Sequence, residues 1–438
     1  MDVIKNFSKV EEESKPPKFL ITEVNTSYNK GDSATVLGIL KIIRNKYPDS
    51  TITVLTPTPS EDIKYYSKYG AKTHIQLCDI MGKKFPRIIY WTFYLLKMSF
   101  LFIRIKLGFL PITKKDKNII ELYRKADLVI SCSGGRLGGK KITPIFNGVI
   151  PIYFAKKLGK KVFVCAQSIE PFKSNFIKYL TRFVLNRVDY ITVREGISLD
   201  VIESLNIKTP SELTADLAFL LDSDSKESGK SLLIKEGIPM NDKLRIGITI
   251  TKLRTRESKS KLKHNQFVNI IKDTIDSLVK ENNAIIIFFP QVIFPDSEDD
   301  RLISIEIKNK IASSLSKNIF VLSENYSPHQ LKAMMGNMDL FIGKRLHSCI
   351  FALSMYVPTI IIGYEKKALG IMKMLGYEKF VLDVNSMSKA KLVSLVKKLL
   401  SEREIIRKYL MQEIPVLQHA AKRNGEFLEI LLKNNIKN

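Results

Sequence analysis

The chain has 438 residues, which suggests two or three domains of ordinary size. Hydrophobic residues make up 45% and charged residues 26%, and this composition excludes a mostly disordered chain, a collagen-like repeat and a small disulfide-stapled scaffold. Lys and Arg total 70 against 44 Asp and Glu, so the formal net charge of +26 favours acidic partners: phosphorylated small molecules, anionic lipid surfaces or nucleic acid.

Residues 1–17 are predicted to form a flexible, solvated arm, because they are rich in charge and lack the apolar run of a targeting signal. The four cysteines stand singly, without a Cys-x-x-Cys pair: Cys78, Cys132, Cys165 and Cys349. We therefore expect buried, reduced thiols and a cytoplasmic location. The five histidines are dispersed as well, so no metal site is predicted.

Short apolar, β-branched runs alternate with stretches of helical periodicity along most of the chain. The first series of predicted strands is Phe19–Val24, Thr51–Leu55, Asp127–Ser131, Val162–Ala166 and Tyr190–Val193. The second is Arg245–Ile250, Ala284–Phe289, Ile319–Leu322, Leu340–Ile342, Thr359–Ile362 and Phe380–Val384. Helical periodicity is clearest at 34–45, 176–186, 267–280 and 303–315. This alternation predicts an α/β protein with two Rossmann-like domains, whose parallel sheets face a cleft.

A polar stretch separates the two series. We therefore predict a first Rossmann-like domain at 18–222, a linker at 223–243 and a second Rossmann-like domain at 244–390. Lys-rich helices at 391–438 are expected to pack back on the first domain. Open α/β sheets bind ligands beyond the carboxyl ends of their strands, so functional residues are sought in those loops.

The loop NKGDSA at 29–34 follows the first predicted strand and opens a helix. Gly31 permits a tight turn, Asp32 can cap the helix, and Asn29 precedes both. The N–H groups exposed there suit a phosphate or a polar substrate, although an ordinary capped turn explains the same residues.

Two further strand ends of the first domain carry candidate ligands. After Asp127–Ser131, Gly134 and Gly135 let a ligand approach the backbone and Arg136 adds an anion contact, unless the chain only turns sharply there. After Tyr190–Val193, Arg194 points into the predicted cleft or else pairs on the surface with the neighbouring glutamate. Asp216 is either a helix cap or a carboxylate of the site.

The sharpest pattern is GKRLHS at 343–348, where a buried strand meets a helix. Three potential cations there (Lys344, Arg345 and His347) oppose the helix dipole, which is unfavourable unless an anion binds. The guanidinium of Arg345 matches a carboxylate or phosphate, and His347 can move a proton near neutral pH. Ser348 completes the predicted set of ligands in this turn.

Together, in order and spacing, these loops resemble the polysaccharide pyruvyl transferase family over roughly residues 18–390. The resemblance rests on NKGDSA, DLVISCSGGRL, DYITVREGIS with ELTADLAFLL, and DLFIGKRLHSCIFALSMYVPTIIIGYEKKALGIM, of which the last is the most specific. It implies a fold similar to the GT-B glycosyltransferases. It also implies transfer of a pyruvyl group from phosphoenolpyruvate to hydroxyls of a sugar, in a cell-surface glycan or its lipid-linked precursor.

Carried onto this chain, the resemblance implies that Arg345 holds phosphoenolpyruvate and that His347 protonates its methylene carbon. Arg194 would be a second donor ligand reaching over from the first domain, which would also bind the acceptor. The base that deprotonates the acceptor would be Asp32 or Asp216. No cofactor is implied, with phosphoenolpyruvate acting as co-substrate.

The segment 88–110 is apolar and aromatic but interrupted by Lys97, Arg104 and Lys106. It is either an interfacial helix on anionic lipid or a helix buried in the first domain. We expect a cytoplasmic protein, peripheral on the inner face of the plasma membrane in the first case. The acidic run at 296–300 is expected to cap a helix and to face solvent, a divalent-ion site being the alternative.

Two other functions remain open. The first is a GT-B glycosyltransferase that uses a nucleotide sugar; against it, Glu365 is followed eight residues later by Lys373, whereas retaining members of that group carry a second Glu there. The second is a non-enzymatic polyanion binder. The basic residues of this chain are dispersed and no nucleic-acid-binding motif is present, so no nucleic-acid partner is predicted.

Overall fold

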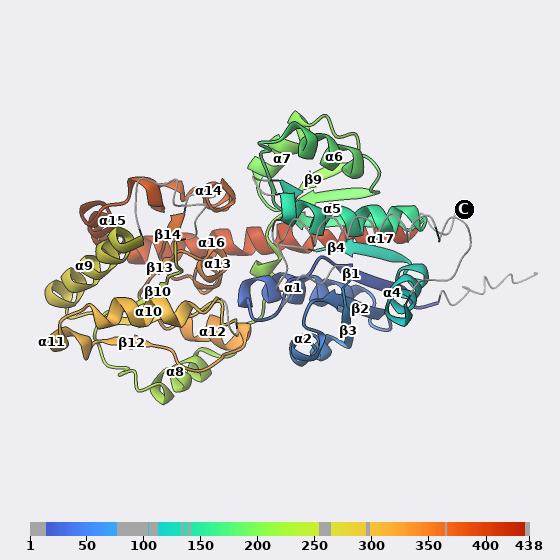
Figure 1. Ribbon diagram of the computed structural model, residues 1–438. Coiled ribbons are helices and arrows are strands. Elements are labelled where there is room, and N and C mark those ends of the chain that lie inside the picture. Colours follow the sequence, from blue (N-terminus) through green and yellow to red (C-terminus); the bar gives the residue numbers. More distant parts are fainter. Residues whose placement is uncertain are drawn as a thin grey trace, which may run out of the picture.

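The computed structural model describes residues 15–76, 104, 113–132, 135, 137–138, 142–253, 264–294, 298–363 and 366–433. Two parallel sheets lie side by side, each flanked by helices (Figure 1). The architecture is the predicted α/β pair of Rossmann-like domains. The predicted glycine-loop residues Gly134 and Arg136 and almost all of 88–110 lie outside the described residues.

The sheet of the first domain has seven strands within the described ranges, in the order β3-β2-β1-β4-β6-β8-β9. These are β1 (Lys18–Thr22), β2 (Thr51–Thr56), β3 (Ala71–Ile75), β4 (Leu128–Ser131), β6 (Val162–Gln167), β8 (Tyr190–Val193) and β9 (Ser211–Leu213). A small parallel pair joins β5 (Leu137–Gly138) to β7 (Ile169–Glu170). The helices are α1 (Lys30–Lys46), α2 (Pro59–Tyr66), α4 (Lys114–Lys125), α5 (Ile142–Lys157), α6 (Asn175–Leu185) and α7 (Gly196–Ser204), with short 3-10 turns η1 (Ser67–Tyr69) and η2 (Leu217–Leu220).

The second domain has a six-stranded parallel sheet in the part of the chain that is described, in the order β12-β11-β10-β13-β14-β15. Its strands are β10 (Arg245–Thr249), β11 (Ile285–Phe288), β12 (Ile319–Val321), β13 (Leu340–Gly343), β14 (Thr359–Gly363) and β15 (Val381–Asp383). Its helices are α8 (Lys226–Lys235), α9 (His264–Asn282), α10 (Asp300–Asn309), α11 (Ser313–Ser316), α12 (Pro328–Met335), α13 (Leu346–Ser354), α14 (Lys366–Met374) and α15 (Lys389–Ser401), with 3-10 turns η3 (Glu378–Phe380) and η4 (Val384–Ser386). Helix α8 lies within the stretch expected as a linker and packs closely on α12 through Gly229.

The two faces of the first sheet belong to different cores. Leu20, Val129 and Val164 face the helices α4 to α7, whereas Phe19 and Ile130 on the opposite face join a larger cluster. That larger cluster continues through η2 and α13 into the second sheet. The two domains therefore share one hydrophobic core.

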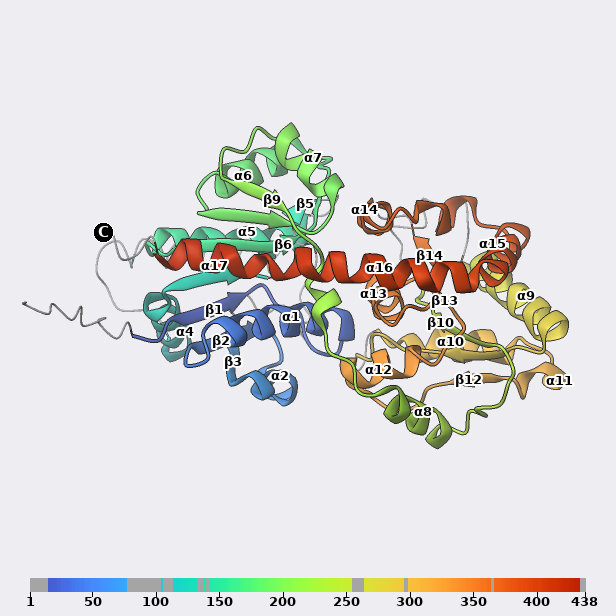
Figure 2. The same ribbon diagram turned by 180° about the vertical axis from the view of Figure 1, so that it is seen from behind.

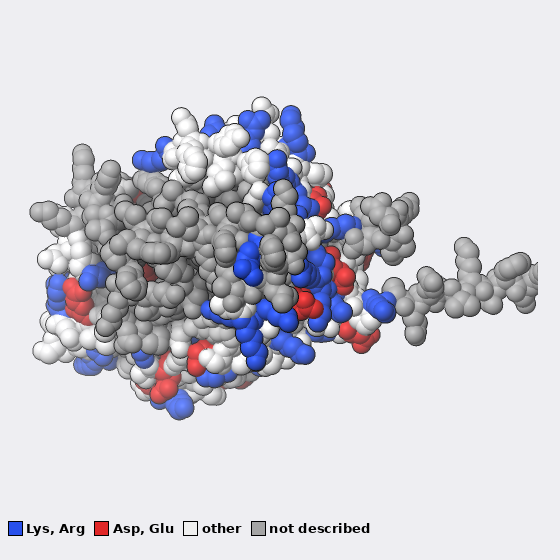
Figure 3. All heavy atoms as spheres, turned by 45° about the vertical axis from the view of Figure 1, so that its right-hand side comes forward, with Lys and Arg blue, Asp and Glu red and all other residues white. Residues whose placement is uncertain are grey.

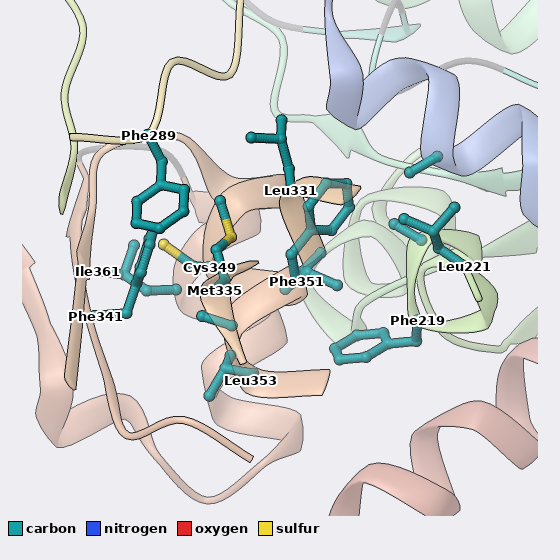
Figure 4. Close-up of a cluster of buried hydrophobic side chains, with 14 of the residues drawn as sticks. Phe219, Leu221, Phe289, Leu331, Met335, Phe341, Cys349, Phe351, Leu353 and Ile361 are labelled. Atoms are coloured by element: carbon teal, nitrogen blue, oxygen red, sulfur yellow. The ribbon is translucent and has the colours of Figure 1, made fainter. Parts of the chain in front are cut away.

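Figure 4 shows where this shared core crosses between the domains. Phe219 and Leu221, at the end of the first domain, lie on one side of Phe351 of α13, while Phe341 and Ile361 lie on the other. The body of α13 is buried, so its N-terminal turn is held in a fixed place.

The last helices return to the first domain. Helix α16 (Arg403–Lys422) spans both domains, and α17 (Asn424–Lys433) lies along the first one (Figure 2). The Phe427 ring stacks on Tyr190 with centroids 4.6 Å apart, and Arg423 pairs with Glu212 at 2.6 Å. Asn424, fully buried, accepts hydrogen bonds from the Thr192 hydroxyl at 2.6 Å and the Cys165 thiol at 3.4 Å.

Cys132, Cys165 and Cys349 are buried free thiols, and burial raises the pKa of each. In the described ranges, no helix combines the length and the apolar character needed to cross a membrane.

We predict that Asn424→Ala lowers the free energy of unfolding by about 1–3 kcal/mol, because the buried Ala421 carbonyl and the Thr192 hydroxyl each lose a partner. Denaturant unfolding measures the change. Glu426→Ala on the same helix is the control, since Glu426 is exposed and its pairing with Arg423 is long at 3.8 Å. Equal stability of Asn424→Ala and the wild type would contradict this role.

Candidate functional site

The N-terminal turn of α13 carries the predicted cations to the domain interface. Gly343 ends β13, and a Cβ there would lie 2.2 Å from the Cys349 sulfur, so glycine allows the helix to fold back on its strand. The Ser348 hydroxyl donates to the Arg345 carbonyl at 2.6 Å and so braces the turn. The ammonium of Lys344 lies 5.9 Å from the centroid of the Phe267 ring.

Arg345 is held by a carboxylate from a distant loop. Its Nε and Nη2 donate to Asp300 at 3.2 and 2.8 Å, and Glu298 lies 3.8 Å from Nη2. Burial alone would lower the pKa of Arg345, but these carboxylates raise it, so the guanidinium stays charged. Asp299 caps α10 as expected, whereas Asp300 is buried at 3% exposure rather than solvated.

The loop that holds Asp300 also binds the first domain. An antiparallel bridge joins Asn29 to Val292, and the Lys30 amide donates to the Gln291 carbonyl at 3.1 Å. The carboxylate of Asp300 accepts hydrogen bonds from the amides of Gln291 and Val292 at 3.2 and 3.0 Å. Arg345 is therefore connected to the start of α1 through a continuous chain of hydrogen bonds.

The start of α1 presents a polar cluster. Asn29 is the N-cap, and its side-chain oxygen accepts from the amides of Gly31 and Asp32 at 3.1 and 3.5 Å. The carboxylate of Asp32 accepts from Asn25 at 2.7 Å and from Asn29 at 2.8 Å. This arrangement fixes a half-buried carboxylate at the start of a helix whose first amides already donate hydrogen bonds to Gln291 and Asn29.

His347 of the second domain packs directly on Gly31 of the first. A Cβ at Gly31 would lie 2.3 Å from His347 Nδ1, so only glycine permits this approach. The other ring nitrogen, Nε2, lies 3.4 Å from the hydroxyl of Thr35, one turn further along α1. With 12% of its side chain exposed, His347 lies between the two domains.

A buried ion pair faces the same ring nitrogen. Arg194 Nη1 donates to Asp216 Oδ2 at 2.7 Å and its Nε donates to Ser168 at 2.7 Å. His347 Nε2 lies 3.5 Å from Arg194 Nη1 and 3.6 Å from Asp216 Oδ2. A neutral imidazole can accept from Arg194, and a protonated one can donate to Asp216.

The alternative of a surface Arg194 paired with Glu195 is wrong. Arg194 is 1% exposed and pairs with Asp216, while Glu195 caps α7 by accepting from the Ser198 amide at 2.9 Å. Glu195 also lies buried, and burial raises the pKa of its carboxyl.

Asp216 is ionised despite complete burial. Burial would raise its pKa, but the Arg194 charge, His347 and the Ala218 amide together hold the pKa well below the ordinary value of 3.8. The carboxylate can therefore stabilise an imidazolium at His347.

The structure brings together seven of the predicted residues: Asn29, Gly31, Asp32, Arg194, Asp216, Arg345 and His347. Lys344 and Ser348 lie in the adjoining turn of α13. Gly135 has a φ of 120°, and a Cβ there would lie 3.7 Å from the Cβ of Ser168. Gly135 therefore lies beside Ser168, on the Arg194 side of the site.

Several neighbouring residues were not predicted as site residues by the sequence analysis. Asp300 is remote from Arg345 in sequence and belongs to a run that resembles an ordinary cap. Ser168 directly follows β6 and could have been found by the rule of strand carboxyl ends. Glu23, after β1, is buried with a φ of 65° and accepts from the Ser131 hydroxyl at 2.9 Å. Strained buried groups of this kind concentrate at functional sites.

Chemically, the arrangement offers two guanidinium groups, a histidine that can exchange a proton, and the N-terminus of α13, which has no side-chain cap. Such groups suit an anionic substrate that must be protonated. Among the described residues, no group of three or more His, Cys, Asp or Glu side chains is placed to hold a metal ion.

Comparison with known proteins points to one family. A family model described as polysaccharide pyruvyl transferase matches residues 29–366. The amylovoran biosynthesis protein AmsJ of Erwinia amylovora is 22% identical over 410 residues, which cover 91% of this chain and 95% of that protein.

Solved structures share the fold at low identity. MnaA of S. aureus with UDP matches with a TM-score of 0.62 at 12% identity, covering 96% of this chain and 97% of that one. UDP-GlcNAc 2-epimerase of Neisseria meningitidis bound to UDP-GlcNAc matches with a TM-score of 0.58 at 14% identity, covering 96% of this chain and 100% of that one. A glycosyltransferase of Rickettsia africae gives 0.55 at 12% identity, covering 97% of each. These likenesses show the GT-B-like fold and nothing further.

We predict that Asp216→Asn lowers the free energy of unfolding by about 3–5 kcal/mol at neutral pH, because it leaves the buried Arg194 charge unpaired. The folded pKa of Asp216 is depressed, so its contribution is present above the ordinary value of 3.8 and is lost as the pH falls through the lower folded value. The difference from the wild type should therefore shrink below about pH 4.

Denaturant unfolding from neutral to acidic pH measures this difference. Asp222→Asn is the matched control, because the side chain of Asp222 is 55% exposed in its pair with Lys41 and such pairs contribute about 0–1 kcal/mol. A difference between Asp216→Asn and the wild type that stays constant down to acidic pH would contradict the assignment.

Proposed function

The chain belongs to the polysaccharide pyruvyl transferase family, and we propose that it transfers a pyruvyl group from phosphoenolpyruvate to hydroxyls of a sugar. The observation that supports this most is the meeting of His347 with Arg194 and Asp216 across the domain interface, next to Arg345. Phosphoenolpyruvate carries a carboxylate and a phosphate on a carbon–carbon double bond, so its reaction needs cations and an acid together.

The second domain would hold the donor. Arg345 presents a planar fork that matches a carboxylate or phosphate, and the amides at the start of α13 add hydrogen-bond donors. Lys344 adds a second cation in the same turn. Asp300 fixes the orientation of Arg345 before the donor binds, which reduces the ordering cost of binding.

His347 would be the general acid. Its proton goes to the methylene carbon of phosphoenolpyruvate, and positive charge develops at the carbon that bears the phosphate. One sugar hydroxyl attacks that carbon, phosphate leaves, and a second hydroxyl attacks to close a cyclic ketal. Of the two hydroxyl protons, one restores His347 and the other leaves with phosphate, so phosphoenolpyruvate and a diol give a ketal and inorganic phosphate.

The first domain would hold the acceptor, with Asp32 as the base that takes each hydroxyl proton and passes it on, one to His347 and the other to the phosphate. Asp216 is less suited to take a proton, because Arg194, His347 and the Ala218 amide hold its pKa low. Asp32 is half-buried at the interface and its Oδ2 accepts only amide donors, from Asn25 and Asn29. Asn29, Gly31 and Gly135 would line the acceptor side.

The acceptor would be a sugar of a polysaccharide or of its lipid-linked precursor, and the reaction would take place in the cytoplasm. The description of AmsJ as an amylovoran biosynthesis protein supports a polysaccharide product. No cofactor enters this scheme.

Mass spectrometry of candidate glycans, after incubation with the protein and phosphoenolpyruvate, tests the proposal directly. The expected product carries one added pyruvyl mass and forms together with inorganic phosphate. Parallel incubations with nucleotide sugars test the glycosyltransferase alternative. Sugar transfer without pyruvyl transfer would overturn the proposal.

We predict that His347→Ala reduces kcat by about 10²–10⁴-fold while phosphoenolpyruvate binding largely survives, since a positioned acid contributes that factor. His347→Gln should lose as much, because an amide can replace the hydrogen bonds but not the proton. Phosphate release and calorimetric donor binding are the measurements. His74→Ala, on strand β3, is the control; turnover like the wild type in either His347 variant would exclude the acid role.

We predict that Arg345→Ala weakens phosphoenolpyruvate binding by about 10–100-fold, the worth of a hydrogen bond to a charged group. Arg345→Lys should recover only part of this, because an ammonium lacks the planar fork. Calorimetry with phosphoenolpyruvate measures both. Arg301→Ala is the matched control, since Arg301 makes a similar paired contact with Asp299 in the same loop. Unchanged donor affinity in Arg345→Ala would contradict its role.

A further inference from the structure

Helix α6 exposes large aromatic side chains to solvent. Phe176 and Tyr179 are 62% and 68% exposed, although the opposite face of the helix is buried through Ile177 and Val184. Isolated exposed apolar residues are common in proteins, but here Tyr179 belongs to a series of ring contacts. The Tyr179 ring stacks on the Phe183 ring with centroids 6.5 Å apart, and the ring centroid of Tyr153 in α5 lies 6.0 Å from that of Phe183.

Cations surround these rings. The guanidinium of Arg187 lies 3.6 Å from the centroid of Phe183, and the ammonium of Lys157 lies 5.4 Å from that of Tyr153. Lys178 and Arg182 are exposed on α6 itself. We call this set the α6 surface; its members are Tyr153, Lys157, Phe176, Lys178, Tyr179, Arg182, Phe183 and Arg187.

The charge of this part of the chain is one-sided. Residues 128–188 contain 11 Lys and Arg and a single acidic residue, Glu170, a net charge of 11 − 1 = +10 out of the total of +26. Figure 3 shows the result in the uppermost part of the molecule, which α6 and α7 form: blue cations lie beside white surface, and red is scarce. The surface therefore complements a negatively charged partner.

We propose that the α6 surface binds the face of a bilayer that contains anionic phospholipid. Aromatic side chains that enter the headgroup region, flanked by Lys and Arg that meet phosphates, are the pattern of interfacial helices. An apolar stripe that continues into the partly buried Leu180 and Phe172 fits an acyl boundary better than it fits stacked bases. This docking goes beyond pyruvyl transfer and needs no turnover.

The position of α6 relates membrane docking to the candidate site. The helix starts at Asn175, seven residues after Ser168, which accepts the hydrogen bond from Arg194. Its first turn therefore follows the carboxyl ends of the first sheet, at the acceptor side. A bilayer against α6 would bring the sugar of a lipid-linked acceptor close to the site.

Co-sedimentation of the full chain with vesicles tests the proposal. The wild type is expected to bind vesicles of phosphatidylglycerol and phosphatidylcholine at low salt, and to bind pure phosphatidylcholine far less. Phe176→Ser with Tyr179→Ser should weaken binding about tenfold or more, and each of Lys178→Gln and Arg182→Gln about fivefold. Thermal unfolding and phosphoenolpyruvate binding show whether each variant is folded.

The matched control is Ile405→Ser with Val416→Ser, which removes equally exposed apolar side chains from α16 (73% and 59%). Undiminished binding of the α6 variants, or an equal loss in the α16 variant, would overturn the proposal. So would wild-type binding to single-stranded RNA but not to vesicles, or a dimer that forms without lipid and is abolished by the Phe176 and Tyr179 changes. Because the experiment measures binding to vesicles, its result tests membrane docking independently of pyruvyl transfer.

Discussion

The contact between His347 and the buried Arg194–Asp216 pair is the interaction on which the site depends. Two charges removed from water at 0% side-chain exposure are costly unless their geometry is well satisfied. Here Ser168 and the Ala218 amide supply the remaining hydrogen bonds. The pair belongs to the first domain and the imidazole to the second, so the site is complete only when both domains meet. Breaking such a pair is strongly destabilising, although its net contribution compared with apolar packing of the same volume is small.

Several independent features fix that meeting. Gly31 admits His347 at a distance that any side chain would block, and the Asn29–Val292 bridge holds the neighbouring loop. Beneath them, a common core joins η2 to α13, and α16 returns across both domains. A site built between helix N-termini on such a base needs little rearrangement to hold a small anion. The shared core also fixes the cations at the start of α13, because the buried body of the helix determines where its first turn lies.

The fold and the centre of the site were accessible from the sequence because both rest on strong local patterns. The central strands are continuous apolar runs, and each predicted strand lies where the structure has one, within a few residues. The edge strands β3 and β9 were missed because AKTHI and SEL are short and polar, and their pairing is decided by their neighbours. In the same way Arg345 and His347 stand out at a strand end, whereas their partners Asp300 and Thr35 come from remote or ordinary positions. Pairings between residues far apart in the chain, within one domain or across the interface, leave no periodic pattern in the sequence.

The distribution of charge separates the chemistry of the site from the charge of the whole chain. At the domain interface each guanidinium already has a carboxylate, Arg194 with Asp216 and Arg345 with Asp300, so the site itself is close to neutral. An anionic donor must therefore be recognised through directed hydrogen bonds and helix amides rather than through bulk positive charge. The excess of Lys and Arg lies elsewhere, and four of these cations (Lys157, Lys178, Arg182 and Arg187) are exposed on the α6 surface. A field of that kind raises the local concentration of anionic ligands and membranes but does not choose among them. A few fixed atoms at the domain interface therefore determine selectivity for the donor. The net positive charge of the chain attracts anionic ligands and membranes over a longer range.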